Sequence, residues 1–396
     1  MRVLLVHNRY RSTSPGGEDR VVDQEADALA HDGHQVERFE RFNDEIDGLT
    51  ATRKALLPFQ VLWSDDARRS LVGALRTFKP DVVHVHNTFP LLSPSVLYAS
   101  RAEGVPVVAT VHHYRLVCAS GTLFRDGSVC HDCVGKLPLP AVRHGCYHDS
   151  VLATVPLAAA RVVHARAWRT MVSAYLFLSR AQRDILAQDG LPPERLFVKP
   201  NFVLPMPRAD GPGDVVVYAG RLAVVKGVDL LMDAWDRFRA EHGAGPLRLA
   251  VAGAGPLQER VVAWSKGRDD VDWMGMLSRA DCADLVAGAR AVLVPSRWEE
   301  TFGLTVVEGM AAGVPSVAPA HASFPDLITD GVDGVLFEPG DTAALARVLA
   351  DVETHPERYR AMGQVALRTY EERFTPARNV DQLRQIYQFA IDNPAV

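Results

Sequence analysis

The sequence predicts an α/β protein built from two doubly wound, parallel-sheet domains. Short runs of β-branched and other apolar residues alternate with segments of helical periodicity, a pattern typical of parallel sheets covered by helices. This alternation stops at a Pro- and Gly-rich stretch, residues 204–213, and then starts again. A length of 396 residues fits two or three domains of roughly 150 residues each.

Six strands are expected before this stretch and six after it. The first six are Val3–Val6, Val36–Phe39, Val82–Val85, Val107–Val111, Tyr175–Leu178 and Leu196–Val198. The second six are Val215–Tyr218, Leu247–Val251, Val271–Met274, Val292–Val294, Ser316–Ala318 and Val335–Phe337. Ligands of open parallel sheets bind at the carboxyl ends of the strands, so the residues after each strand are the first place to look for a site.

The composition is that of a soluble enzyme. With 47% hydrophobic and 23% charged residues, the chain is neither disordered nor fibrous. A formal net charge of -5 gives no electrostatic basis for binding nucleic acid. The run Val3–Val6 is too short for a signal peptide, and Val151–Ala160 is about half a membrane span. We therefore expect a cytoplasmic protein.

Two cations follow the strand expected at Val215–Tyr218. Arg221 comes after Gly220, and Lys226 precedes Gly227, just before a helical segment. A guanidinium fork and an ammonium at the end of a strand could bind a diphosphate. The alternative is a solvated surface turn.

A second polar segment follows the strand at Val292–Val294. Glu300 and Glu308 flank Phe302-Gly303-Leu304, and a helical pattern begins near Thr305. Gly303 would let the backbone approach a ligand, and the free amides at the helix start would face a phosphate. Glu308 is expected in the first helical turn, where Thr305-x-x-Glu308 also matches a capping box. Its carboxylate therefore has two readings, a ligand for ribose hydroxyls or a cap for the Thr305 amide.

These motifs together resemble glycosyltransferase family 4. The resemblance rests on Gly220-Arg221-x4-Lys226-Gly227 and Glu300-x7-Glu308 with Phe302-Gly303-Leu304. It extends to Gly16-Gly17-Glu18 after the first strand and to His112 after the fourth, so it covers nearly the whole chain. It implies the GT-B fold, in which two Rossmann-like domains face each other across a cleft.

The resemblance also implies a division of labour. Residues 1–203 would bind the acceptor, residues 213–375 would bind the donor, and a helix at 376–396 would cross back to the first domain. Glu300 and His112 are the expected catalytic residues. The donor-binding residues would be Gly16, Gly17, Arg221, Lys226, Met276, Phe302, Gly303, Leu304, Thr305 and Glu308. Among these, Glu308 would hold the ribose hydroxyls, and backbone groups near Met276 would face the base.

The implied activity is retaining transfer of a sugar from a nucleotide diphosphate sugar to an acceptor hydroxyl. A UDP-sugar is the preferred donor and a GDP-sugar the second choice. The acceptor would be a glycan, a lipid-linked molecule or a small molecule, as in polysaccharide or secondary-metabolite biosynthesis. No cofactor or catalytic metal is required. The alternatives are a nucleotide-sugar hydrolase or epimerase, and a non-catalytic nucleotide-sugar-binding scaffold.

The polar residues after the fourth strand have simpler interpretations as well. The run His112-His113-Tyr114 could merely end a strand with hydrogen-bonded side chains. His84 and His86 alternate on one face of a strand, which favours packed or hydrogen-bonded core groups over metal ligands.

An insertion at about 115–150 carries four cysteines. Cys118, Cys130, Cys133 and Cys146 could close a structural zinc site with four thiolates. Reduced structural thiols are the alternative.

A basic segment covers residues 136–183. It contains seven Lys and Arg but only one acid, Asp149, and apolar residues lie between them. Such a segment could bind an anionic membrane peripherally, at the inner face of the membrane, or it could be a helix that packs on the sheet with its arginines outward.

Overall fold

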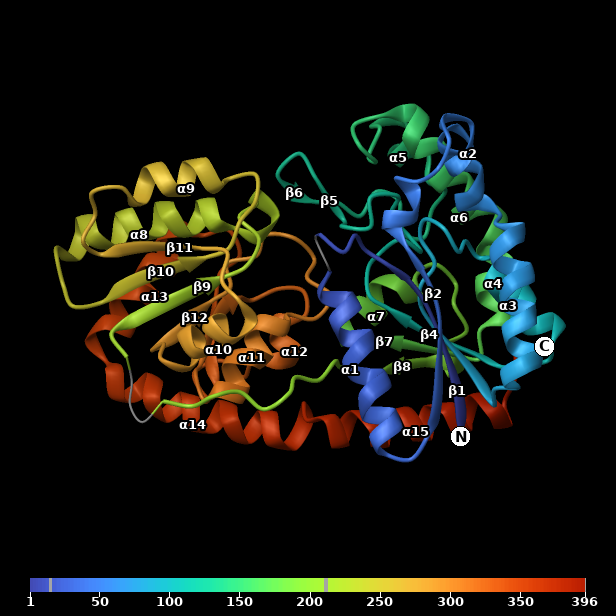
Figure 1. The fold of residues 1–396 in the computed structure, drawn as a ribbon. Helices are drawn as coiled ribbons and strands as arrows, with labels where there is room; N and C mark the ends of the chain where they lie inside the picture. Colours follow the sequence, from blue (N-terminus) through green and yellow to red (C-terminus); the bar gives the residue numbers. More distant parts are fainter. Residues whose placement is uncertain (14–15, 210–212, 396) are drawn as a thin grey trace. The chain divides into compact units, whose positions relative to one another are not determined.

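The computed structural model describes residues 1–13, 16–209 and 213–395, so positions 210–212 of the Pro- and Gly-rich stretch lie outside the described residues. The chain divides into two compact units. Unit 1 comprises Met1–Leu123, Cys130–Pro200 and Asn379–Val396, and unit 2 comprises Phe124–Val129 and Asn201–Arg378. Each unit holds a six-stranded, entirely parallel sheet (Figure 1).

The sheet of unit 1 has the strand order β2-β1-β3-β4-β7-β8. Its strands are β1 (Arg2–Arg9), β2 (Gln35–Phe42), β3 (Val82–Asn87), β4 (Val107–Val111), β7 (Ala174–Phe177) and β8 (Leu196–Val198). Its helices are α1 (Gly17–His31), α2 (Ala51–Leu62), α3 (Asp65–Phe78), α4 (Ser95–Ala102), α5 (Leu139–Arg143), α6 (Val151–Met171), α7 (Arg180–Ala187) and α15 (Pro376–Asp392), with short 3-10 turns η1 (Asn43–Ile46) and η2 (Pro193–Arg195).

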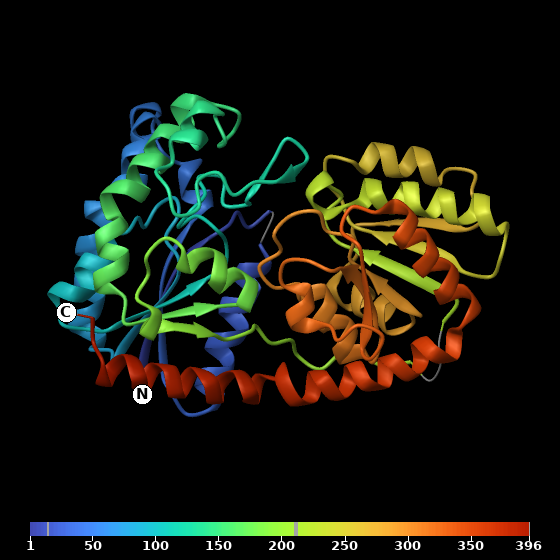
Figure 2. The same ribbon diagram turned by 180° about the vertical axis from the view of Figure 1, so that it is seen from behind.

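Alternate residues of each central strand of unit 1 enter different cores. Leu4 and Val6 of β1 pack in a cluster with α3, α4 and the end of α6. Val3 and Leu5 pack in a second cluster with α1 and α15. Helices therefore cover both faces of the sheet, as Figures 1 and 2 show. Because both faces are buried there, central strands such as β4 and β7 consist of nearly continuous apolar runs, whereas the edge strand β2 is mostly polar.

Helix α15 is part of the core of unit 1 although it is last in the sequence. Its buried residues Val380, Leu383 and Tyr387 join α1 in the same apolar cluster. The Tyr387 hydroxyl also lies 2.7 Å from Nδ1 of His84 on β3. The C-terminal helix thus covers one face of a sheet whose strands all come from the first half of the chain.

The sheet of unit 2 has the order β11-β10-β9-β12-β13-β14. Its strands are β9 (Val215–Ala219), β10 (Arg248–Ala252), β11 (Val271–Gly275), β12 (Ala291–Leu293), β13 (Ser316–Pro319) and β14 (Gly334–Phe337). Its helices are α8 (Val228–His242), α9 (Gln258–Ser265), α10 (Arg279–Ala287), α11 (Leu304–Ala312), α12 (Phe324–Leu327), α13 (Thr342–Thr354) and α14 (Pro356–Arg373), with the 3-10 turn η3 (Val224–Lys226).

All twelve predicted strands are present, which confirms the α/β fold class. The structure adds a two-stranded antiparallel hairpin, β5 (Phe124–Arg125) and β6 (Ser128–Val129), inside the predicted insertion. Two residues per strand are too few for a hydrophobic alternation to show in the sequence. Residues 124–129 group with unit 2, whereas the rest of the insertion groups with unit 1.

A buried ion pair links three distant segments of unit 1. Nζ of Lys199, which follows β8, lies 2.7 Å from Oε2 of Glu25 on α1 and 3.3 Å from the Asn379 side-chain oxygen on α15. Neither Glu25 nor Lys199 is exposed to solvent. Burial alone would raise the pKa of Glu25, but the Lys199 ammonium and His84 outweigh it and hold that pKa well below its ordinary value.

Removing one member of this pair should destabilise unit 1 strongly. We expect Glu25→Gln to lower its free energy of unfolding by about 3–5 kcal/mol, because Lys199 is then left as an uncompensated buried charge. Adding Lys199→Met should restore much of the loss. Urea dependence of hydrogen exchange at the β3 amides measures both, with the exposed Glu37→Gln as control. A loss below 1 kcal/mol in Glu25→Gln would contradict this account.

Candidate active site

The loops after β9 and β10 of unit 2 lie directly against each other. The Gly220 amide donates to the Ala252 carbonyl at 3.0 Å, and the Leu222 amide donates to the Ala254 carbonyl at 2.9 Å. A side chain at position 253 would place its Cβ 2.0 Å from the Gly220 carbonyl oxygen, so this approach requires glycine. The contact positions the start of the Gly220–Lys226 segment at the carboxyl edge of the sheet.

A second glycine contact brings Lys226 to the loop after β12. Gly227 has φ +70°, and a Cβ there would lie 1.8 Å from the Pro295 carbonyl oxygen. The Arg297 amide donates to the Val225 carbonyl at 2.9 Å. As a result, Nζ of Lys226 lies 3.0 and 2.9 Å from the two carboxylate oxygens of Glu300. Two residues that the sequence separates by 74 positions form one ion pair.

The Glu300 carboxylate has further donors in its own loop. The Trp298 indole nitrogen and the Ser296 hydroxyl both donate to its Oε2, the latter at 3.3 Å. Lys226 Nζ lies 4.8 Å from the centre of the Trp298 ring, in a cation–π contact. This carboxylate is therefore oriented by three side chains. Trp298 and Ser296 were not predicted as site residues, although both lie within four positions of Glu300.

Helix α11 begins one residue earlier than predicted. Its N-cap is Gly303, at φ +101°, and Leu304 is the first helical residue. Thr305 is thus inside the helix, which excludes the capping box that was the alternative reading of Glu308. Glu308 itself is in the second turn, so its expected place in the first turn is wrong. This position requires glycine because its φ of +101° is strained for other residues, and because a Cβ would lie 3.1 Å from the Phe324 ring. The Ser323 hydroxyl donates a hydrogen bond to the Phe302 carbonyl at 2.6 Å.

The other predicted donor residues lie on the surface of unit 2. Arg221 is exposed, and among the described residues none accepts a hydrogen bond from its guanidinium. Met276 follows β11 and is 75% exposed. Glu308 is half-buried on α11. The structure therefore joins Lys226 to Glu300 directly and leaves the guanidinium of Arg221 available to a ligand.

The predicted glycine motif of unit 1 forms the start of α1. Gly16 is the N-cap, and Gly17 is the first helical residue. A Cβ at Gly16 would lie 2.7 Å from the Tyr10 ring, which explains a glycine here. Asp19 accepts a hydrogen bond from the Gly16 amide at 3.1 Å and pairs with Nε2 of His7 at 2.7 Å. The turn is thus held to the end of β1.

Glu18 is a titratable residue that the sequence interpretation left without a role. Its Oε1 is buried and has no hydrogen-bond partner among the described atoms. Burial raises the pKa of Glu18 to about 7, against the opposing effect of His7 and with help from Asp19. The signal in the sequence was its place directly after the two glycines.

His112 is buried at the carboxyl end of β4, where it is hydrogen-bonded to His86. Its Nε2 lies 2.9 Å from Nδ1 of His86, and Nε2 of His86 lies 3.4 Å from Oε1 of Glu25. Burial lowers the pKa of His86 to about 3 and holds that of His112 well below its ordinary value, so both imidazoles are neutral. The interpretation of His84 and His86 as hydrogen-bonded core groups is confirmed.

The structure does not support the zinc reading of the insertion cysteines, Cys118, Cys130, Cys133 and Cys146. Among the described residues, the only group of three or more potential ligands within 4.8 Å is Glu25, His84 and His86. Cys133 instead packs with Ala119 and Ala141, and Cys118 contacts the Ser120 hydroxyl at 3.2 Å. Cys146 packs on the same cluster, and burial, with help from Cys118 and Cys130, raises the pKa of the Cys133 thiol. No three of these described sulfur atoms come within 4.8 Å of one another. The cluster of Glu25, His84 and His86 lies in the core, where Glu25 pairs with Lys199 at 2.7 Å.

Two family models together match both units. The model described as Glycosyltransferase Family 4 matches residues 15–205, and the model described as Glycosyl transferases group 1 matches residues 213–354. D-inositol 3-phosphate glycosyltransferase 1 of Catenulispora acidiphila is 31% identical over 339 residues, which cover 79% of this chain and 73% of the relative. A glycogen synthase of Mycobacterium tuberculosis is 26% identical over 95% of this chain and 90% of its own length.

Solved structures share the same architecture. Anabaena HepE in complex with UDP aligns with a TM-score of 0.69 at 17% identity, over 98% of this chain and 100% of that chain. The sucrose-phosphate synthase of Thermosynechococcus elongatus aligns with a TM-score of 0.70 at 18% identity, over 98% of each chain. These likenesses show the fold, which is GT-B with two Rossmann-like domains. The chain is a glycosyltransferase that belongs to glycosyltransferase family 4.

Proposed function

We propose that this enzyme transfers a sugar, with retention of anomeric configuration, from a nucleotide diphosphate sugar to an acceptor hydroxyl. The ion pair between Lys226 and Glu300 carries the proposal, because it places a cation and an oriented carboxylate beside the start of α11. Unit 2 binds the donor and unit 1 the acceptor. UDP is the favoured nucleotide, since the similar Anabaena structures contain UDP or UDP-glucose, and GDP is the second choice.

Each donor residue has a role that fits its chemistry. Arg221 and Lys226 bind the diphosphate, together with the Leu304 and Thr305 amides at the start of α11. Glu308 binds the ribose hydroxyls. Backbone groups near Met276 face the base. Glu300, with the amides of 302–304, holds the transferred sugar, while Gly16 and Gly17 contact the phosphate. Without donor, the Lys226 ammonium is paired with Glu300, and a bound diphosphate would compete for it.

The chemical step proceeds on one face of the sugar. The bond between the anomeric carbon and the phosphate oxygen breaks as the acceptor oxygen bonds to that carbon from the same side. The acceptor proton passes to the departing phosphate oxygen. Catalysis is electrostatic, because Arg221, Lys226 and the helix amides stabilise the charge that grows on the diphosphate. His112, as a neutral imidazole, lines the reaction centre.

A panel of nucleotide sugars tests the function. The true donor should raise the midpoint of thermal unfolding by an amount that grows with ligand concentration, since binding adds RT ln(1+[L]/Kd). Product analysis with and without acceptors then separates the classes. Conversion of donor alone would favour the hydrolase or epimerase, and binding without any turnover would favour the scaffold.

Glu300→Gln should lower kcat about 100-fold or more at saturating donor. The neutral amide has one acceptor oxygen in place of two, so it cannot accept hydrogen bonds from Lys226 and from the sugar hydroxyls as the carboxylate does. The donor Kd should change little. Steady-state kinetics and calorimetric titration measure the two quantities. Glu338→Gln, an exposed acid of unit 2, is the matched control. An unchanged kcat in Glu300→Gln would remove this residue from the chemistry.

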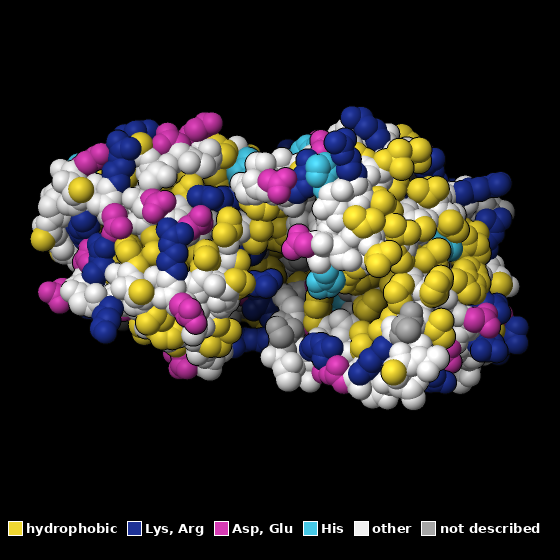
Figure 3. All heavy atoms as spheres, turned by 90° about the horizontal axis from the view of Figure 1, so that it is seen from above, with side chains coloured by type: hydrophobic (Ala, Val, Ile, Leu, Met, Phe, Trp, Pro, Cys, Tyr) yellow, Lys and Arg dark blue, Asp and Glu magenta, His cyan; other side chains and the backbone are white. Residues whose placement is uncertain are grey.

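We also propose that unit 1 docks on an anionic membrane. Ten large apolar side chains are exposed on or beside α2, α5 and α6: Leu56, Phe59, Trp63, Leu137, Leu139, Val151, Leu152, Val155, Val162 and Val163. Figure 3 shows hydrophobic side chains gathered over this part of unit 1. Lys136, Arg143 and Arg166 are exposed among them. None of the described helices is long and apolar enough to cross a membrane.

Some cations of the basic segment, residues 136–183, bind protein groups and do not all point into solvent. Arg161 is turned inward, where it donates to Asp189 at 2.7 Å and to three backbone carbonyls. Arg169 donates to the Asp189 carbonyl. Apolar contact therefore contributes more to the proposed docking than the count of cations suggests.

Flotation with vesicles tests the docking. The protein should float with vesicles rich in phosphatidylglycerol and float less with purely zwitterionic ones, since each cation near an anionic surface contributes about 1 kcal/mol. Leu152→Gln, at 86% exposure, should reduce flotation. Val332→Gln, at 48% exposure on unit 2, should not. Equal flotation of both variants with the unaltered protein would contradict the proposed surface.

A further inference from the structure

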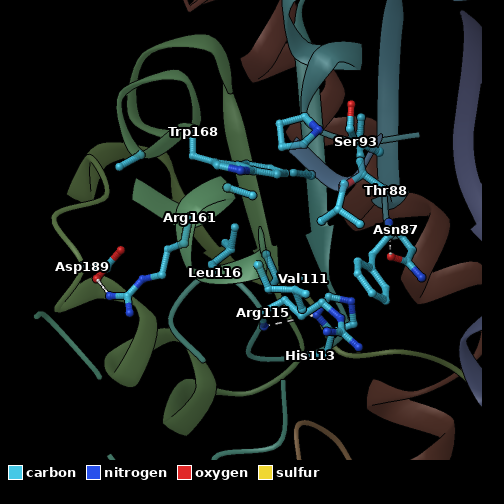
Figure 4. A pocket seen from close by; sticks show the side chains of 18 of the residues that line it. Asn87, Thr88, Ser93, Val111, His113, Arg115, Leu116, Arg161, Trp168 and Asp189 are labelled. Atoms are coloured by element: carbon cyan, nitrogen blue, oxygen red, sulfur yellow. Dashed lines mark hydrogen bonds and ion pairs between the residues drawn. The ribbon is translucent and has the colours of Figure 1, made fainter. Parts of the chain in front are cut away.

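Unit 1 contains a cavity between the carboxyl ends of β3 and β4 and the inner face of α6. Its wall on α6 is formed by residues one or two turns apart, chiefly Leu157, Ala158, Ala165 and Trp168. Small side chains at 158 and 165 leave the space open. The opposite wall comes from segments that follow β3 and β4, as Figure 4 shows. Most of this lining is apolar.

One end of the cavity is polar. It carries two hydrogen-bond donors, Arg115 and His113, and neither is paired with a carboxylate of the described residues. The Arg115 guanidinium stacks at 4.0 Å over the Phe89 ring and donates to the Ala119 carbonyl at 3.1 Å. No carboxylate oxygen of the described residues lies within 4.0 Å of it. Glu18 acts on Arg115 from further away, and with a pKa of about 7 it carries only part of a charge at neutral pH.

His113 supplies the second donor. Its Nδ1 accepts a hydrogen bond from the Arg115 amide at 3.3 Å, and burial lowers the pKa of the ring to about 3. A neutral imidazole that accepts at Nδ1 carries its hydrogen on Nε2. This Nε2 is buried and has no partner among the described atoms. A buried donor without an acceptor is costly, so the arrangement favours an incoming oxygen.

We propose that this cavity binds an acceptor that carries an anionic group next to a hydrocarbon chain. The anionic oxygens would be held by Arg115 and His113, and the chain would lie along α6 toward Trp168. The inference rests on the proposed assignment of the acceptor to unit 1, and it specifies the chemical class of that acceptor. It also agrees with the exposed apolar surface on the outer side of α6, from which such a molecule could enter.

Calorimetric titration with three probes tests the two halves of the cavity. Octyl phosphate should bind at least 10-fold more tightly than either 1-octanol or inorganic phosphate, because only it uses both ends. If octyl phosphate binds no better than inorganic phosphate, the apolar part of the proposal is overturned. If it binds no better than octanol, the anionic part is overturned.

Two variants locate the binding. Arg115→Met should weaken octyl phosphate about 10- to 100-fold while octanol changes little, as expected for loss of a charged hydrogen bond of about 1.5–3 kcal/mol. Ala165→Leu should fill the cavity and weaken both probes. Ala102→Leu, at an exposed position at the end of α4 and outside the cavity lining, is the matched control. Unchanged binding in Ala165→Leu would place the ligand elsewhere and overturn the proposal.

The same variants distinguish this proposal from the proposed function. Stabilisation by nucleotide sugar should survive in Ala165→Leu, since unit 2 binds the donor. If no nucleotide sugar stabilises any variant but octyl phosphate binds as described, the donor assignment fails and the amphiphile site stands. If donors stabilise every variant and octyl phosphate fails to bind, the amphiphile site fails alone.

Discussion

The parallel order of both sheets is the constraint on which the candidate site depends. In a parallel sheet every strand ends at the same edge, so segments far apart in the chain meet there. In unit 2 this places the turn after β9 against the loop after β12, and in unit 1 it places the start of α1 beside the ends of β3 and β4. Buried apolar strands supply the rigidity, and the loops supply the chemistry.

Glycines convert that general proximity into specific contacts. Gly227 permits the Pro295 carbonyl to approach, and Gly253 permits the Gly220 carbonyl to approach. Any side chain at either position would separate two loops by more than an ångström. Because the ion pair of Lys226 and Glu300 depends on the first contact, a backbone requirement and a chemical requirement are met by the same short segment.

Unit 1 buries polar groups both in its core and near the ends of its strands. Glu25, Lys199 and His84 pair with one another in the core, and they fix α1, β3 and the segment after β8 around α15. Glu18 and His113, nearer the strand ends, each keep a buried atom without a partner. A buried polar atom without a hydrogen-bond partner costs stability, and at a strand end a bound ligand can supply that partner.

The sequence by itself determined the fold class, all twelve main strands and the family, because hydrophobic periodicity and motif spacing are local properties of the chain. It also singled out Lys226 and Glu300, but not that they touch. Only the tertiary structure decided that α11 starts at Leu304 after the Gly303 cap, that no three of the described insertion cysteines bring their sulfur atoms within 4.8 Å of one another, and that Arg161 turns inward. Helix ends, thiol distances and side-chain direction depend on neighbours such as Phe324, Ala141 and Asp189, which are remote in sequence and meet these groups only when the chain is packed.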